Sequence, residues 1–333
     1  MDATADPMIR LTGVGKTYPD GTMAVQGLDL DVARGSLVCL VGPSGCGKST
    51  TLKMINRLIE PTAGTILLDG RDVLAQDPVA LRRGIGYVIQ QVGLFPHQTV
   101  AVNVGTVLTL QGAPRATVRS RSLEMLELVG LDPEVYADRY PHQLSGGQQQ
   151  RVGVARALAA DPPVLLMDEP FGAVDPVVRA RLQDEFRRLQ RTLRKTVVLV
   201  THDIDEAVRM GDRVAVFAAG GRLAQEGTPA ELLARPVDEF VADFVGSTRG
   251  LRRLAVTRID PAYLEPLDGV TTGDLGGVVD ADATLEEALA ALLREDRQVV
   301  AVRRGGQFLG VLTPNGVHRA LRASLADPSL SDR

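Results

Sequence analysis

A short apolar segment, a glycine-rich loop and a helical pattern follow one another near the start of this chain. The segment Leu37–Val41 is uniformly apolar, and residues 42–49 read GPSGCGKS, which matches G-x-x-x-x-G-K-[ST] at every fixed position. In this context the glycines let backbone N–H groups turn toward phosphate oxygens, and the helix start adds a favourable dipole. The sequence therefore predicts a nucleotide site on an α/β fold with mostly parallel central strands.

The side chains of this loop have distinct expected roles. The ammonium group of Lys48 should reach the β- and γ-phosphates, and the Ser49 hydroxyl should ligate Mg²⁺. Cys46 is expected to fill space in the loop rather than to react. The predicted nucleotide-binding set comprises Gly42, Pro43, Ser44, Gly45, Cys46, Gly47, Lys48, Ser49 and Thr50.

Two adjacent carboxylates follow another buried strand. The apolar run Val164–Met167 ends in Asp168 and Glu169. Asp168 is suited to holding Mg²⁺, and Glu169, one residue later, is placed to act as the general base on an attacking water. Together with the glycine-rich loop, this pair predicts hydrolysis of the bound nucleotide.

Composition narrows the class of protein further. The chain has 333 residues, 44% hydrophobic and 23% charged, which suits about two globular domains. The net charge of −4 argues against nucleic acid as a partner. Two cysteines do not make a disulfide framework, so we expect a reducing compartment. The start of the chain has no signal-peptide pattern, and the apolar runs are too short for a membrane-spanning helix. Any function at a membrane therefore needs a partner.

The remaining chain divides into recognisable regions. Residues 8–32 are β-rich and interrupted at Pro19-Asp20-Gly21, which predicts an antiparallel flank. The segment from about residue 90 to 160 is helix-rich, which predicts a helical subdomain beside the sheet. From residue 278 the pattern β-α-β-β-α predicts a small α+β module, whose first helix opens with a capping box from Thr284 to Glu287.

The segment Leu144–Gln148 reads LSGGQ, and its Ser-Gly-Gly precedes a helix predicted from Gln149 to Leu158. With the loop and the acidic strand end, it resembles the ATP-binding cassette (ABC) family over roughly residues 8–245. The resemblance implies a P-loop ATPase with ATP and Mg²⁺ as cofactors. It also implies a second copy of the chain as partner, because in this family the signature of one copy closes over the ATP of the other; here that signature is Ser145, Gly146, Gly147 and Gln148.

Further site residues are implied by the same resemblance. Tyr18 is similar to the aromatic residue that stacks on adenine, and Gln90 to the Q-loop glutamine that senses Mg²⁺ and water, although the neighbouring Gln91 is an alternative. Asp175 is similar to the D-loop aspartate at the dimer interface, and His202 to the switch histidine on the γ-phosphate. The implied catalytic set is Glu169, His202 and Gln90, and the implied Mg²⁺ set is Ser49, Gln90 and Asp168.

Two segments resemble one subgroup of importers. IGYVIQQVGLFPH (residues 85–97) and KMINRL (residues 53–58) are similar to the ATPases that serve uptake of glycine betaine, carnitine, choline and proline. The resemblance implies integral-membrane permease subunits and, indirectly, a solute-binding protein as partners, at the cytoplasmic face of the cell membrane. Two alternatives stay open: an importer of an amino acid or other small solute, and a non-transport ABC ATPase acting on DNA or ribosomes.

The C-terminal region carries a separate expectation. Residues 1–246 are predicted to be the ABC ATP-binding domain, 247–277 a linker or degenerate CBS region, and 278–325 a single module that resembles one CBS repeat. Gly316 stands where that family often has Asp, which disfavours nucleotide binding by the module. A structural or dimer-stabilising role and a response to ionic strength both stay open.

Overall fold

The computed structural model describes residues 6–90, 93–172, 174–246, 249–266, 275–294 and 299–326. Gln91, Ala173 and residues 247–248 and 267–274 of the predicted linker lie outside these ranges. The chain forms two compact units, the first ending at Ala224 and the second beginning at Gln225.

The first unit is built on a six-stranded sheet of order β10-β9-β3-β8-β7-β6. The neighbours from β9 to β6 are parallel, and every residue of β3, β7 and β8 is buried. Uniformly apolar strands are expected where both faces of a parallel sheet are covered. The strands are β3 (Leu37–Val41), β6 (Ile85–Val88), β7 (Val164–Asp168), β8 (Thr196–Thr201), β9 (Arg213–Ala218) and β10 (Arg222–Gly227).

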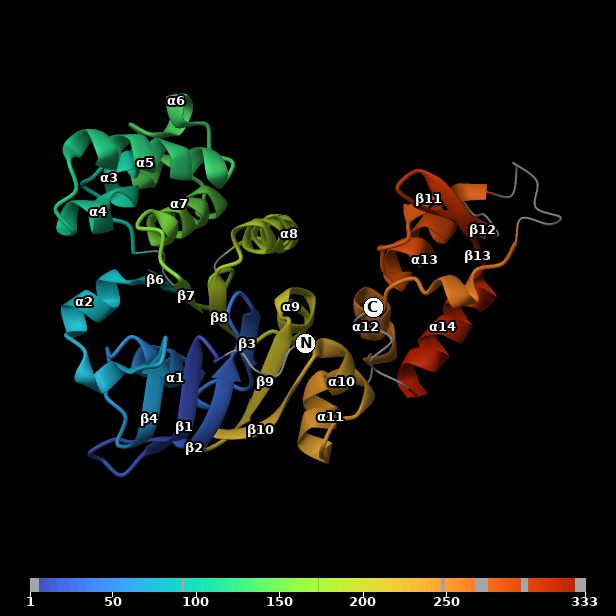
Figure 1. The fold of residues 1–333 in the computed structure, drawn as a ribbon, viewed down its shortest axis with the longest axis horizontal. Helices are drawn as coiled ribbons and strands as arrows, with labels where there is room; N and C mark the ends of the chain where they lie inside the picture. Colours follow the sequence, from blue (N-terminus) through green and yellow to red (C-terminus); the bar gives the residue numbers. More distant parts are fainter. Residues whose placement is uncertain are drawn as a thin grey trace. The chain divides into compact units, whose positions relative to one another are not determined.

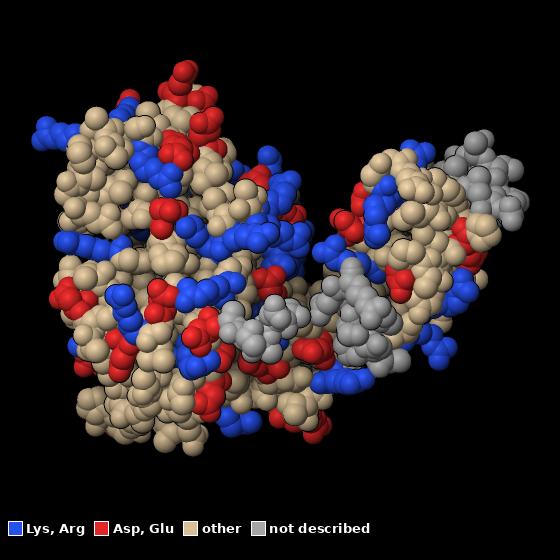
Figure 2. All heavy atoms as spheres, in the orientation of Figure 1, with Lys and Arg blue, Asp and Glu red and all other residues tan. Residues whose placement is uncertain are grey.

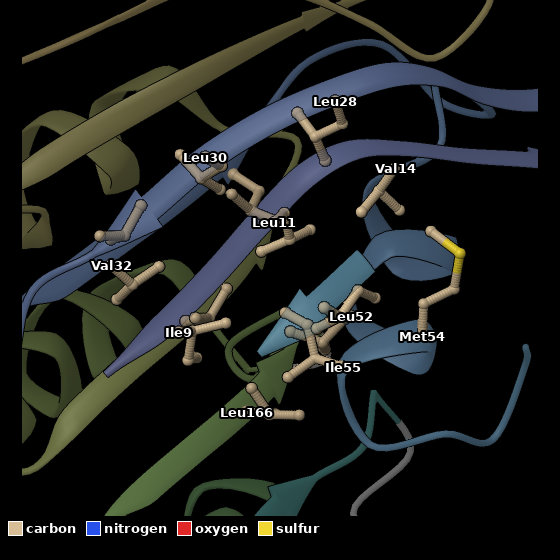
Figure 3. Packing of buried hydrophobic residues seen from close by; sticks show 14 of the residues in the cluster. Ile9, Leu11, Val14, Leu28, Leu30, Val32, Leu52, Met54, Ile55 and Leu166 are labelled. Atoms are coloured by element: carbon tan, nitrogen blue, oxygen red, sulfur yellow. The ribbon is translucent and has the colours of Figure 1, made fainter. Parts of the chain in front are cut away.

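A second sheet of order β2-β1-β4-β5 confirms the predicted antiparallel flank. Its alternating apolar residues face helix α1 and the central sheet, and Figure 3 shows Leu11 and Leu28 of the flank above Leu52 of the helix and Leu166 of β7. This core fixes α1 between the two sheets. The elements are β1 (Ile9–Thr17), β2 (Met23–Val32), α1 (Lys48–Ile55), β4 (Ala63–Leu68) and β5 (Arg71–Asp72).

The segment between β6 and β7 is helical, as predicted, and its helices gather beyond the edge of the sheet (Figure 1). Buried Asn103 organises the start of this region: its Oδ1 accepts from the Phe95 N–H at 2.7 Å and its Nδ2 donates to the Phe95 carbonyl at 3.1 Å. The helices between β6 and β7 are α3 (Val100–Val104), α4 (Thr106–Leu110), α5 (Arg115–Leu128), α6 (Pro133–Tyr136), the short helix η2 (Pro141–Gln143) and α7 (Gly146–Leu158). Before β6 lie the short helix η1 (Val73–Ala75) and α2 (Pro78–Arg83).

Two further helices complete the first unit. Helix α8 (Pro176–Leu193) connects β7 to β8, and α9 (Ile204–Met210) connects β8 to β9. Because β3, β7 and β8 are parallel neighbours, the loops after all three meet at one edge of the sheet.

The second unit confirms the predicted β-α-β-β-α order. Strand β12 pairs with β11 in parallel and with β13 in antiparallel fashion. The predicted capping box is present, since the Thr284 N–H donates to Glu287 Oε2 at 2.8 Å and the Glu287 N–H donates to Thr284 Oγ1 at 3.2 Å. Leu285, Ala288 and Leu292 are buried in its core.

The elements of the second unit are α10 (Pro229–Ala234), α11 (Glu239–Val245), α12 (Arg249–Val256), η3 (Pro261–Tyr263), β11 (Leu275–Asp280), α13 (Leu285–Arg294), β12 (Val299–Arg304), β13 (Gln307–Leu312) and α14 (Pro314–Ala326). The unit therefore includes three helices that precede the predicted module.

Candidate nucleotide-binding site

The glycine-rich loop of residues 42–49, called the phosphate loop below, lies between β3 and α1, as predicted. Gly42 and Gly47 have φ angles of 154° and 93°. A Cβ at Gly42 would lie 2.3 Å from the Phe217 carbonyl oxygen, and one at Gly47 would lie 2.1 Å from the Ala24 carbonyl oxygen. A side chain at either position would clash with the backbone, so the loop can lie this close to its neighbours only with glycine.

Lys48 is folded into this loop. The side chain is 5% exposed, and its Nζ donates to the carbonyl oxygens of Gly42 and Pro43, both at 2.8 Å. The same Nζ lies 3.5 Å from Cys46 Sγ. The positive charge is therefore held at the position where the sequence predicts phosphate groups.

Ser49 and Asp168 lie in contact, although they are far apart in the sequence. Ser49 Oγ donates to Asp168 Oδ1 at 2.7 Å, and Asp168 is 7% exposed. Hydroxyl and carboxylate oxygens are ligands that Mg²⁺ accepts. In the described part of the chain no cluster of three or more His, Cys, Asp or Glu side chains could hold a metal ion. Two oxygens that leave room for phosphate and water ligands suit Mg²⁺ at a nucleotide.

Glu169 is the centre of the second half of the site. Its φ of 44° is rare for a residue other than glycine, and its N–H donates to the Val200 carbonyl at 2.9 Å. Its Oε2 accepts from Gln90 Nε2 at 2.8 Å, and its Oε1 lies 3.3 Å from His202 Nδ1. The structure thus brings together the three residues of the predicted catalytic set.

Tyr87, on β6 near Asp168, is a neutral side chain. Burial, with a smaller contribution from the negative charge of Asp168, raises the pKa of Tyr87 to about 12. The phenol therefore keeps its proton at physiological pH.

The signature segment is a capped helix start. The Ser145 N–H donates to Gln148 Oε1 at 2.9 Å, and the Gln148 N–H donates to Ser145 Oγ at 3.3 Å, which forms a capping box. Helix α7 therefore begins at Gly146 rather than at the predicted Gln149. Gln148 Nε2 also donates to the Tyr136 hydroxyl at 3.0 Å. These bonds stay within the helical region, so the structure does not bring the signature together with the phosphate loop of its own chain.

Tyr18 lies after β1, and Asp175 lies in the loop between β7 and α8. Tyr18 follows β1 in a turn that the Gly21 N–H closes by donating to the Tyr18 carbonyl at 2.9 Å. Lys16 Nζ lies 5.5 Å from the centroid of the Tyr18 ring. Asp175 directly precedes α8, and its carbonyl accepts from the Arg179 N–H at 2.8 Å. Gln91, the alternative to Gln90, lies outside the described residues.

One buried polar group beside the site was missed by the sequence reasoning. Glu206 on α9 is 6% exposed and accepts from the Thr201 hydroxyl and from Gln183 Nε2. Burial raises the pKa of the Glu206 carboxyl, although both hydrogen bonds oppose this shift. The available signal was a threonine and an acid on either side of His202, but their contact with α8 depends on the tertiary fold.

The surface of the first unit has mixed charge. Figure 2 shows basic and acidic side chains interspersed on one face, with basic side chains most frequent around α8.

No helix among the described residues has the length and apolar character needed to span a membrane.

Known proteins are similar to this chain in sequence. A family model described as "ABC transporter" matches residues 25–172. The chain is 52% identical over 290 residues to the glycine betaine/carnitine/choline transport ATP-binding protein OpuCA of Bacillus subtilis (strain 168), covering 87% of this chain and 73% of the relative. It is 46% identical over 309 residues to the glycine betaine uptake system ATP-binding protein YehX of Escherichia coli (strain K12), covering 92% and 97%.

A solved structure resembles the first unit. It is the dimeric post-hydrolysis state of the ATP-binding cassette MJ0796 bound to ADP and Pi, with a TM-score of 0.60 and 38% sequence identity. The alignment covers 67% of this chain and 99% of that one.

Proposed function

Since this chain belongs to the ABC transporter ATP-binding family, we propose that it is the ATPase subunit that powers an importer of a compatible solute. The reaction is the hydrolysis of ATP with water to ADP and phosphate. The solute is a quaternary amine or similar osmoprotectant, such as glycine betaine, choline, carnitine or proline. The observation that carries the proposal is the convergence of Gln90, Glu169 and His202 beside the phosphate loop.

The phosphate half of the site works by exchange of partners. The Lys48 ammonium leaves the Gly42 and Pro43 carbonyls and binds the β- and γ-phosphates, because a hydrogen bond between an ammonium and an anionic phosphate oxygen is stronger than one between an ammonium and a neutral carbonyl. Ser49 and Asp168 are the residues that would hold Mg²⁺, with Gln90 next to them. A bound Mg²⁺ would neutralise charge that develops on the phosphate oxygens.

The catalytic half positions a water. Glu169 acts as general base and takes the proton of the water that attacks the γ-phosphorus. Gln90 and His202 each contact one oxygen of this carboxylate, so its direction is set before the nucleotide binds. His202 then contacts the γ-phosphate.

A second copy of the chain completes each site. The signature residues Ser145–Gln148 make their bonds away from the phosphate loop of the same chain, and the related MJ0796 cassette is described as a dimer. We infer that the signature of one copy covers the ATP of the other, with Asp175 at the interface. Tyr18 stacks on the adenine base.

The permease and the solute are inferred from the relatives. OpuCA and YehX are named for the transport of glycine betaine, and OpuCA also for carnitine and choline. We infer that this chain attaches to integral-membrane permease subunits at the cytoplasmic face of the membrane, with a solute-binding protein as the indirect partner. The proposed domains are the ATP-binding domain over 1–246, a linker region over 247–277 and a CBS-like module over 278–325 that stabilises the dimer.

Glu169→Gln tests the catalytic assignment. The variant should bind ATP and dimerise, but its turnover should fall by at least about 100-fold because the amide cannot accept the proton. Phosphate release by the purified full-length chain measures the turnover, and ATP binding is the control. Near-normal turnover would overturn the role of Glu169. Uptake of labelled glycine betaine and choline by the complex reconstituted with its permease tests the solute.

A further inference from the structure

We propose that Glu206 is a positioning residue for ATP hydrolysis, which acts by fixing the backbone that carries His202. This inference rests on the proposed function, because it assigns no role to Glu206 unless His202 takes part in hydrolysis. It concerns a buried side chain that contacts neither the phosphate loop nor Glu169.

The carboxylate of Glu206 lies in a closed set of buried partners. Glu206, Thr201 and Gln183 are 6%, 1% and 5% exposed. The Thr201 hydroxyl donates to Glu206 Oε2, and Gln183 Nε2 donates to Glu206 Oε1 at 3.2 Å. A buried carboxylate is costly unless both of its oxygens are hydrogen-bonded, and here both are.

Thr201 transfers this restraint to the residue after His202. Its hydroxyl gives its one proton to Glu206, and its oxygen accepts from the Asp203 N–H at 3.0 Å. Asp203 in turn caps α9, because its Oδ1 accepts from the Asp205 N–H at 2.8 Å. The residues on both sides of His202 are therefore tied to the helix that carries Glu206.

His202 itself has little packing to hold it. Its side chain is 60% exposed, and its Nδ1 lies 3.3 Å from Glu169 Oε1. A side chain with so much exposure takes its direction mainly from the backbone that precedes it. Without the Thr201–Glu206 bond, the imidazole would lose its fixed distance to Glu169.

Gln183 extends the network to another part of the site. It lies on α8, which directly follows Asp175, whereas Glu206 lies on α9. A single carboxylate thus joins the loop of His202 to the helix after the D-loop. This links two segments that both belong to the proposed dimer site.

Two variants remove the network at different atoms. Glu206→Ala deletes the carboxylate, and Thr201→Val replaces the hydroxyl by a methyl group of similar size. Both should lower kcat about 10- to 100-fold, since a displacement of about 1 Å at a reacting group can cost 100-fold. The Kd for ATP should stay within about threefold, because neither residue contacts the phosphate loop. Turnover and ATP binding are measured on the full-length chain.

Conservative variants and a matched control separate positioning from loss of stability. Thr201→Ser keeps the hydroxyl that donates to Glu206. Glu206→Gln keeps one oxygen that can accept from Thr201, and Gln183 can rotate its amide so that its oxygen accepts from the new NH2 group. The kcat of both variants should stay within about threefold of the original. Thr196→Val is the control: this buried threonine lies at the other end of β8, where its Oγ1 accepts from the Gly35 N–H at 2.9 Å. It should lower Tm without lowering kcat.

A double-mutant cycle with His202→Ala decides the question. If Glu206 acts through His202, then Glu206→Ala added to His202→Ala should lower kcat by less than about twofold more. Normal kcat in folded Thr201→Val, or full additivity in the cycle, would overturn the inference. If Glu206→Ala does not fold, the same cycle with Thr201→Val gives the answer. If His202→Ala matches the original chain, the role of His202 fails and the inference fails with it. If the original chain hydrolyses no ATP, the proposed function fails instead.

Discussion

The phosphate loop and the signature segment are both glycine-containing starts of helices, yet the chain uses them differently. In the phosphate loop Gly42 and Gly47 have positive φ and lie close against the backbone of Phe217 and Ala24. In the signature segment a Cβ at Gly147 would meet only side chains, those of Val178 at 3.2 Å and Leu182 at 3.6 Å. Gly42 and Gly47 of the first motif are therefore required by the chain's own fold, whereas Gly147 of the second is not held by backbone contacts of this kind, which agrees with the proposed role of the signature at a partner's ATP.

The largest effect should come from Gly47→Ala. The added Cβ would lie 2.1 Å from the Ala24 carbonyl oxygen at a φ of 93°, so the loop must move. We expect a loss of at least about 3 kcal/mol in the free energy of unfolding, from left-handed strain and overpacking together. ATP binding should weaken by more than about 100-fold. Thermal melting and ATP titration measure the two effects.

Gly45→Ala is the matched control for that prediction. Gly45 has a φ of 78°, but no atom lies within 4 Å of its Cβ position. The variant should therefore show only the strain of about 1–2 kcal/mol. Equal losses in Gly45→Ala and Gly47→Ala would break the claim that close backbone contact fixes the loop.

A smaller and different effect is expected from Ser145→Ala. The change removes the hydroxyl that caps α7, which should cost about 1 kcal/mol of stability. ATP binding by the single chain should stay the same, while hydrolysis should fall about tenfold or more because the partner's ATP loses a donor. Turnover and ATP binding are measured side by side.

Thr284→Ala provides the comparison for Ser145→Ala. Thr284 caps α13 through the same kind of capping box, in the second unit. The variant should lower the free energy of unfolding by about 1 kcal/mol, as Ser145→Ala does, and should leave the rate of ATP hydrolysis unchanged. If both variants lose hydrolysis equally, the signature is only a structural cap.

The motif-based part of the site could be predicted from the sequence because its spacing is local. The loop from Gly42 to Ser49 needs a fixed backbone, and Asp168 and Glu169 follow one buried strand. The parallel sheet then places both at one edge, so their proximity followed from the fold class. The start of α7 was predicted too late because the Ser145–Gln148 capping box was not recognised.

The remaining contacts depend on tertiary packing. Gln90 and Glu169 are 79 positions apart, and only a family resemblance suggested that they meet. Gln183 and Glu206 come from two different helices, and neither has a sequence pattern that predicts their contact. Side-chain contacts between separate elements are set by helix packing, which residue spacing does not specify.

Mixing two defective chains tests most directly whether one site needs two copies. In a Glu169→Gln background, one chain carries Lys48→Ala and the other Ser145→Arg, and native mass spectrometry counts bound ATP. Each variant alone should stay monomeric, and the mixture should form a dimer with one ATP, at the intact loop of one chain and the intact signature of the other. Dimers of the Ser145→Arg chain alone, or a mixture that stays monomeric, would contradict the account.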